Sequence, residues 1–121
     1  MSKKKRRKRR YAQPNQCQKS TNRHHLLFQG RYWSKGYAKA LREAFVFSIR
    51  IDLHNQLHNE VIHDVPRPSD QEIKRLLYLY HDQIDYTANM TIEQACAWLI
   101  ANTDDADFKR AIMIQHDFLT R

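Results

Sequence analysis

Two prolines near the middle of the chain set the strongest limit on what it can fold into. Pro66 and Pro68 flank one arginine, and neither can continue a helix, because proline lacks a backbone N–H and its ring clashes with the preceding turn. At 121 residues the chain fits one domain with a modest core. The sequence therefore predicts a single α+β domain over 23–121, with one unit over 23–64 and a helical part over 69–121.

The unit before the prolines contains two predicted strands. The apolar run of residues 26–28 predicts the first strand, which Gly30 closes. Over residues 46–51 apolar side chains alternate, as is typical of a half-buried strand, and those expected on one face are Phe47, Ile49 and Ile51. We expect the two strands to form a small two-stranded sheet.

Two helices are predicted in the same unit. One covers residues 35–45 and is capped by Ser34, and its inward side chains are expected to be Tyr37, Leu41 and Ala44 or Phe45. The other is capped by Asp52 and runs to about His63, where the segment with the two prolines stops it.

About three helices are predicted after the prolines, as a small bundle. Their starts are marked by side chains that can cap a helix: Ser69 with Glu72, Thr91 with Gln94, and Asp104 or Asp105. The side chains expected to face inward are Ile73, Leu76, Leu77, Tyr80, Ile84, Ile92, Ala95, Trp98, Leu99, Phe108, Ile112, Gln115 and Leu119. We interpret this part as scaffold or as a surface for a partner.

Eight consecutive basic residues near the start of the chain account for its net charge of +8. They are Lys3, Lys4, Lys5, Arg6, Arg7, Lys8, Arg9 and Arg10, and the remaining Lys and Arg residues are balanced by the Asp and Glu residues. Such a run repels itself and cannot pack, so we expect residues 1–22 to form a disordered arm and linker. An arm of this kind binds nucleic-acid phosphates; a solubilising tail and a nuclear address are the alternatives.

The sequence predicts a cytoplasmic protein. No apolar stretch is long enough to span a membrane, and no apolar segment follows the basic run as it would in a secretory signal. Cys96 lies in a helical apolar pattern typical of a core residue. Cys17 lies in the polar linker, where a free thiol suits a reducing cytosol, and a role for it as a metal ligand is left open.

The helix predicted before the prolines carries two histidines on its apolar face. At about 100° per residue, His54 and His58 lie roughly 40° apart and share that face with Val61. Burying two imidazoles there without partners would cost a few kcal/mol. Neutral imidazoles one turn apart can instead bind one metal ion, each through one ring nitrogen. The alternative is that both histidines pack with ordinary hydrogen bonds.

A second pair of histidines, His24 and His25, lies at the head of the first predicted strand. The predicted elements follow one another in a recognisable order: a strand with His-His, a connection, a second strand, and a helix with His-x-x-x-His. Over about residues 22–63, this order resembles the ββα-metal finger of HNH-type endonucleases. The resemblance implies one divalent metal ion, with zinc as the first choice, held by His24, His54 and His58. It also implies an open metal position for water or phosphate, and His25 as the general base that activates water.

The chain departs from this family's pattern in its strands. The family places an asparagine in the strand before the helix, where Ser48 is the only polar neutral residue in this chain. The connection between the strands is long and contains a predicted helix of its own. Because neighbouring residues of a strand point to opposite faces, His24 and His25 can serve one site only where the strand breaks.

A second resemblance covers residues 24–33, the pairs Gly36–Tyr37 and Leu41–Arg42, and the Pro-Arg-Pro segment. These residues resemble those of small proteins encoded by prophages and conjugative elements of Gram-positive bacteria. Some phage proteins of this size inhibit the RNA-guided nucleases of their host. The resemblance therefore implies a bacterial cytoplasm, a nucleoprotein partner and an anti-CRISPR role.

Basic and aromatic residues gather around the histidine pattern. Arg23, Arg31 and Arg42 are the candidate phosphate ligands, because a guanidinium can hold a phosphate through two hydrogen bonds. Tyr32 or Trp33 can stack on a base or a sugar. The alternative for Trp33 is packing on the helix over 35–45.

Three functions follow from these features. The first is a metal-stapled basic protein that binds DNA, RNA or a nucleoprotein such as an RNA-guided nuclease. The second is a metal-dependent DNA endonuclease of the HNH type. In the third, the histidines are ordinary packed residues and only the basic arm is functional.

Overall fold

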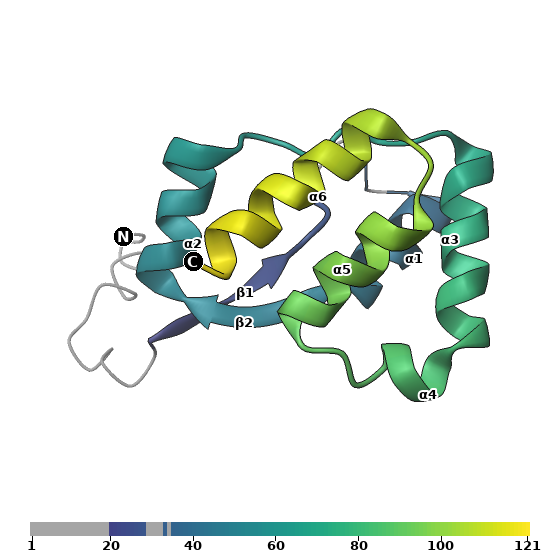
Figure 1. The fold of residues 1–121 in the computed structure, drawn as a ribbon, viewed down its shortest axis with the longest axis horizontal. Coiled ribbons are helices and arrows are strands. Elements are labelled where there is room, and N and C mark those ends of the chain that lie inside the picture. Colours follow the sequence, from purple (N-terminus) through teal and green to yellow (C-terminus); the bar gives the residue numbers. More distant parts are fainter. Residues whose placement is uncertain (1–19, 29–32, 34) are drawn as a thin grey trace, which may run out of the picture.

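A two-stranded antiparallel sheet and the helices that follow it make up the fold of this chain (Figure 1). β1 (Thr21–His25) pairs with β2 (Val46–Arg50), and α1 (Gly36–Ala44) lies between them in the sequence. A computed structural model describes the chain at residues 20–28, 33 and 35–121. The predicted α+β class, a small two-stranded unit followed by a helical part, is confirmed.

β1 ends where we predicted the first strand to begin. Its register runs from Thr21 opposite Arg50 to His25 opposite Val46, and residues 26–28 follow the strand instead of forming it. The side chains of residues 26–28 are all buried. Consecutive residues of a strand face opposite sides, so three buried in a row fit a chain that has left the sheet to enter the core. The prediction of a strand at 26–28 is therefore wrong.

α1 has nearly the predicted bounds but a different inward face. Its buried side, extended past the helix end, consists of Ala38, Leu41 and Phe45. This spacing of three and four residues forms one stripe, and it leaves Tyr37 outside that stripe, 57% exposed. The prediction that Tyr37 faces inward is therefore wrong. The N-cap residue is Lys35, and the predicted cap, Ser34, lies outside the described residues.

The helix that carries His54 and His58 begins and ends earlier than predicted. It consists of α2 (Ile51–Gln56) followed directly by a π-helical turn, η4 (Leu57–Val61), so it stops two residues before His63. The predicted cap, Asp52, lies inside the first turn, because β2 leads straight into the helix and Arg50 is the N-cap residue. Asp52 instead pairs with the guanidinium of Arg50, at 2.6 and 3.0 Å.

The helical part contains α3 (Asp70–Asp82), the short α4 (Ile84–Thr87), α5 (Ile92–Asn102) and α6 (Ala106–Leu119). The predicted caps are confirmed, since a backbone N–H three residues on donates to each of the side chains Ser69, Thr91 and Asp105. Of the side chains expected to face inward, only Ile84 is exposed, because the chain bends before it and begins α4.

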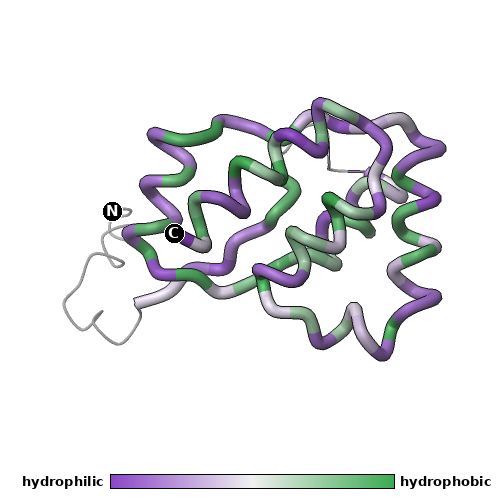
Figure 2. The backbone as a smooth tube through the Cα atoms, viewed as in Figure 1, coloured by the Kyte–Doolittle hydropathy of each residue, from purple (hydrophilic) through white to green (hydrophobic). Residues whose placement is uncertain are grey.

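α6 positions the helical part against the histidine-bearing unit. It packs against α5 along one side and against η4 nearer its C-terminal end (Figure 1). Apolar and polar residues alternate along the helices, as expected when each buries one face (Figure 2). Within the described ranges, none of the helices has both the length and the apolar character that crossing a membrane requires.

Candidate metal centre

Three histidines from three elements meet beside the sheet. His24 belongs to the last part of β1, His54 to α2 and His58 to η4. One ring nitrogen of each lies within 4.8 Å of those of the other two, close enough for the three to hold one metal ion. The ring centroids are 5.3 Å apart for His24–His54, 5.5 Å for His24–His58 and 4.6 Å for His54–His58. The structure therefore brings together the three residues predicted as metal ligands.

The π-helical turn lies at the second of the two helical histidines. In η4 the N–H of Ile62 donates to the carbonyl oxygen of Leu57, five residues earlier, at 3.0 Å. Such a turn inserts one extra residue into the helix, and it is rare and frequent at functional sites. Here Leu57 is fully buried, while His58 is half-buried and packs on Phe28, with ring centroids 4.3 Å apart. The irregular turn therefore belongs to the site.

His24 is the buried member of the cluster. Its side chain is 0% exposed, and its Nε2 lies 2.9 Å from Oε1 of Gln115 on α6. The amide nitrogen of Gln115 in turn donates to the carbonyl oxygen of Leu26 at 2.8 Å. Nδ1 of His24 is buried and has no hydrogen-bond partner among the described residues. A buried nitrogen in that state is costly unless something at the site binds it.

All three imidazoles are neutral near pH 7. Burial lowers the pKa of His24 from 6.5 to about 4, opposed by its hydrogen bond to Gln115 and assisted by the neighbouring histidines. Burial also lowers the pKa of His54, and it lowers the pKa of His58 together with repulsion from His54. Because only a neutral imidazole has a lone pair for a metal, the site is in its ligand form at neutral pH.

The three residues fit a divalent ion such as zinc. Zinc–nitrogen bonds of about 2.0–2.1 Å in a tetrahedral site place the nitrogens about 3.3 Å from one another. One ring nitrogen of each of His24, His54 and His58 lies within 4.8 Å of those of the other two, which is close enough for the three to hold one ion. Three neutral ligands leave one tetrahedral position for water or an anion. The unpartnered buried nitrogen of His24 is the feature that such an ion would satisfy.

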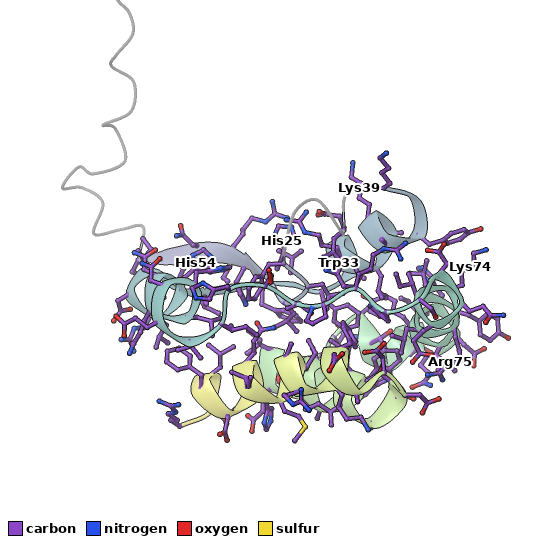
Figure 3. The ribbon with its side chains drawn as sticks, turned by 90° about the horizontal axis from the view of Figure 1, so that it is seen from above. His25, Trp33, Lys39, His54, Lys74 and Arg75 are labelled. Atoms are coloured by element: carbon purple, nitrogen blue, oxygen red, sulfur yellow. The ribbon has the colours of Figure 1, made fainter. Side chains whose placement is uncertain are left out.

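An open pocket of about 300 Å³ lies against the cluster. It is lined by Arg23, His25, Phe28, Arg42, His54 and His58. Figure 3 shows the labelled His54 toward the end of the molecule opposite Lys74 and Arg75, with His25 between His54 and Trp33. β1 ends at His25, so the two adjacent histidines contribute differently: His24 lies in the core, and His25 lines the pocket. Both lie near His54 and His58, although β1 runs through both residues and the break predicted at this point does not occur.

His25 is held by a carboxylate from α1. Its Nε2 lies 3.2 Å from Oε2 of Glu43, which also accepts a hydrogen bond from Nη1 of Arg42 at 3.1 Å. Burial lowers the pKa of His25, and the charge of Arg42 lowers it further, while Glu43 raises it. A half-buried, neutral imidazole therefore lies in the pocket beside His54 and His58.

Two of the predicted phosphate ligands line this pocket. They are Arg23 on β1 and Arg42 on α1. Nε of Arg42 is buried and without a partner among the described residues. Arg31, Tyr32, Cys17 and the arm residues 3–10 lie outside the described residues.

Trp33 has a structural role. It is 0% exposed, and its ring nitrogen donates to the carbonyl oxygen of Val65 at 3.2 Å. It is therefore buried in the core, with its ring 6.0 Å from that of Phe108, and cannot stack on a base.

Sequence reasoning did not identify two residues that hold the site. Gln115 was placed on the inward face of the last helix, and a polar amide within an apolar stripe was a signal that it has a buried partner. Glu43 had no comparable signal, because an exposed glutamate on a helix is ordinary, and only the fold brings it to His25.

No protein-family model, no curated protein and no solved structure matches this chain.

Proposed function

We propose that the protein binds one divalent metal ion through His24, His54 and His58, and uses this centre to hold a phosphate group of a nucleic acid or a nucleoprotein. The observation that carries the proposal is the meeting of three neutral imidazoles, two of which line a pocket together with two arginines. Zinc is the first choice of metal, because an all-histidine site suits it.

Charge at the pocket favours an anion. Neutral imidazoles leave the double charge of a bound ion uncompensated, and Arg23 adds a positive charge to the same pocket. Arg42 also lines the pocket, although the Glu43 carboxylate balances its charge. A guanidinium binds phosphate through paired hydrogen bonds, so a phosphate at the open metal position would meet the charge of the ion and that of Arg23.

The basic arm supports the same proposal from the sequence. Eight adjacent positive charges attract phosphates without regard to base sequence, and they strengthen binding most at low salt. The identification of the target as an RNA-guided nuclease, and of the chain as a phage protein, stays a prediction from resemblance.

The first test is the metal content of protein purified without a histidine tag, measured by elemental mass spectrometry. We expect about one zinc ion per chain and its loss in His54→Ala. His63→Ala is the matched control, because His63 is exposed and lies outside the cluster. Absence of metal from the unmodified protein, or equal metal in His54→Ala, would contradict the proposal.

The second test measures binding of labelled DNA and RNA duplexes by fluorescence anisotropy at several salt concentrations. Replacing Arg23 and Arg42 together by glutamine should weaken binding and reduce the slope of log K against log salt by about 2. Arg110→Gln, an exposed change on α6, serves as control and should reduce it less. Equal slopes for the double variant and the control would show that the pocket does not contact the phosphates of the nucleic acid.

Hydrolysis of a phosphodiester is a second candidate function, favoured by the contact between His25 and Glu43. With the Nε2 proton directed at Glu43, Nδ1 of His25 keeps its lone pair and can take a proton from water. The resulting hydroxide attacks phosphorus, and the bond to the leaving oxygen breaks. A bound divalent ion would stabilise the negative charge that develops on that oxygen.

Plasmid nicking in the presence of magnesium, manganese or zinc separates the two candidates. For an endonuclease, His25→Ala should abolish nicking while bound metal and fold remain. Because Glu43 raises the pKa of His25, Glu43→Gln should move the acid limb of the rate profile to lower pH. Absence of nicking with all three metals would leave binding as the function.

A further inference from the structure

Gln115 on α6 links the C-terminal helix to the histidine cluster. Both it and His24 are 0% exposed, so no water competes for the hydrogen bond between them. The residues come from opposite ends of the domain, since His24 lies on β1. The pair therefore exists only when α6 is packed in place.

The orientation of the Gln115 amide is determined by its second partner. A carbonyl oxygen can only accept, so the atom facing the carbonyl oxygen of Leu26, at 2.8 Å, must be the amide NH₂. The amide oxygen is then directed to His24, 2.9 Å from its Nε2. Because this oxygen can only accept, Nε2 of His24 must carry the proton.

A neutral imidazole carries one proton, so a proton on Nε2 leaves the lone pair on Nδ1. Nδ1 is the buried atom without a partner among the described residues, and the His24 ring lies 5.3 Å from that of His54 and 5.5 Å from that of His58. We infer that Gln115 is a positioning residue, which holds His24 in the Nε2–H form and so assigns Nδ1 as its metal-binding nitrogen. The metal-binding part of this inference rests on the proposed function, while the proton position does not.

The proton position can be read directly in metal-free protein. Long-range ¹H–¹⁵N spectra of ¹⁵N-labelled, chelator-treated protein distinguish the two neutral forms of each histidine. For His24 we expect Nε2–H in the unmodified chain and a mixture of forms in Gln115→Met, which has similar length but no acceptor. A His24 that carries its proton on Nδ1 in the unmodified chain would overturn the inference.

Zinc affinity, measured by competition with a chromophoric chelator, gives the second readout. Gln115→Met should bind zinc about 10–100-fold more weakly, as is typical when the partner of a ligating histidine is lost.

A control separates positioning from general loss of stability. Thr87→Val also removes a buried side-chain hydrogen bond, from Oγ1 to the carbonyl oxygen of Tyr80, but away from the cluster. It should leave zinc affinity and the His24 proton unchanged. If Gln115→Met loses no more zinc affinity than Thr87→Val, the positioning role of Gln115 is refuted, although the metal site itself is not. Absence of zinc binding in the unmodified chain would instead refute the proposed function, and the proton position would still decide the role of Gln115.

Discussion

At the scale of single residues, His24 shows how a buried histidine is kept neutral. The imidazole is enclosed by the core and receives one neutral partner, the amide of Gln115, so a positive charge there would have no counterion among its contacts. Burial therefore lowers its pKa to about 4, well below the 6.5 of an exposed histidine. The same absence of charge keeps its second nitrogen available as a ligand.

The depressed pKa of His24 predicts acid sensitivity of the metal-free protein. The unfolded chain takes up this proton near pH 6.5 and the folded chain only near pH 4, so acid favours unfolding. Stability should be full above pH 6.5 and fall as the pH is lowered toward 4, by about 3 kcal/mol from this residue. Urea unfolding at pH 7.5, 6 and 5 with a chelator present measures the loss.

The non-titrating variant His24→Gln provides the comparison for that measurement. It should lose less stability over the same pH interval than the unmodified chain. If both chains lose stability in parallel, the acid sensitivity belongs to other groups and the burial argument for His24 fails.

At the scale of elements, one carboxylate joins α3 to the turn between α5 and α6. Glu72 on α3 accepts hydrogen bonds from Arg75 on the same helix, and from Thr103 and Asp104 in the turn between α5 and α6. These bonds lower the pKa of Glu72 to about 2, with the bond to Arg75 contributing most. Glu72 was predicted as the second residue of a capping box, but its side chain fastens the α5–α6 turn to α3 instead.

Replacing Glu72 by glutamine should weaken this junction. The uncharged amide loses the charge-assisted bond to Arg75 and one of its acceptor positions, and the expected cost is about 1–3 kcal/mol at pH 7. Because the folded pKa of Glu72 is depressed, its contribution is present above pH 4.5 and is lost as the pH falls toward 2. Thermal unfolding of Glu72→Gln beside Glu93→Gln, an exposed acidic residue on α5, checks this; equal melting temperatures would contradict it.

At the scale of the whole molecule, the proposed metal centre and the Gln115 contact bring together elements from both ends of the folded region. Its proposed ligands come from β1, α2 and η4, and Gln115 connects them to α6. None of these parts can hold the ion alone. Metal binding should therefore be linked to folding of the domain as a unit.

Zinc is expected to raise the melting temperature of the protein. At a free zinc concentration of about 100 times Kd, the folded state gains about 2.7 kcal/mol. For a folded region of about 100 residues this corresponds to a rise of roughly 10 °C or more. Differential scanning calorimetry with zinc and with chelator measures the rise, and His54→Ala should show none. A chain whose melting temperature does not respond to zinc has no linked metal site.

Local sequence patterns determined the helical part and the identity of the clustered histidines. Ser69, Thr91 and Asp105 were recognisable as caps, because a cap depends only on residues within one turn. His54 and His58 were recognisable for the same reason, since helix periodicity places them on one apolar face. The choice of His24 as the third ligand came from the resemblance to the ββα-metal finger, and the structure places His24 close to both residues.

Only the tertiary structure decided how the strand ends and what holds the histidines. Residues 26–28 were predicted as a strand, because a short apolar run has no hydrophobic periodicity by which a strand could be distinguished from a buried turn. Asp52 read as a cap, but β2 runs directly into α2, and the cap position belongs to Arg50. Glu43 and Gln115 lie far in sequence from the histidines they contact, and contacts of that kind follow from packing of whole elements. The sequence alone determines periodicity and caps, which are local, whereas the environment of each imidazole depends on the folded chain.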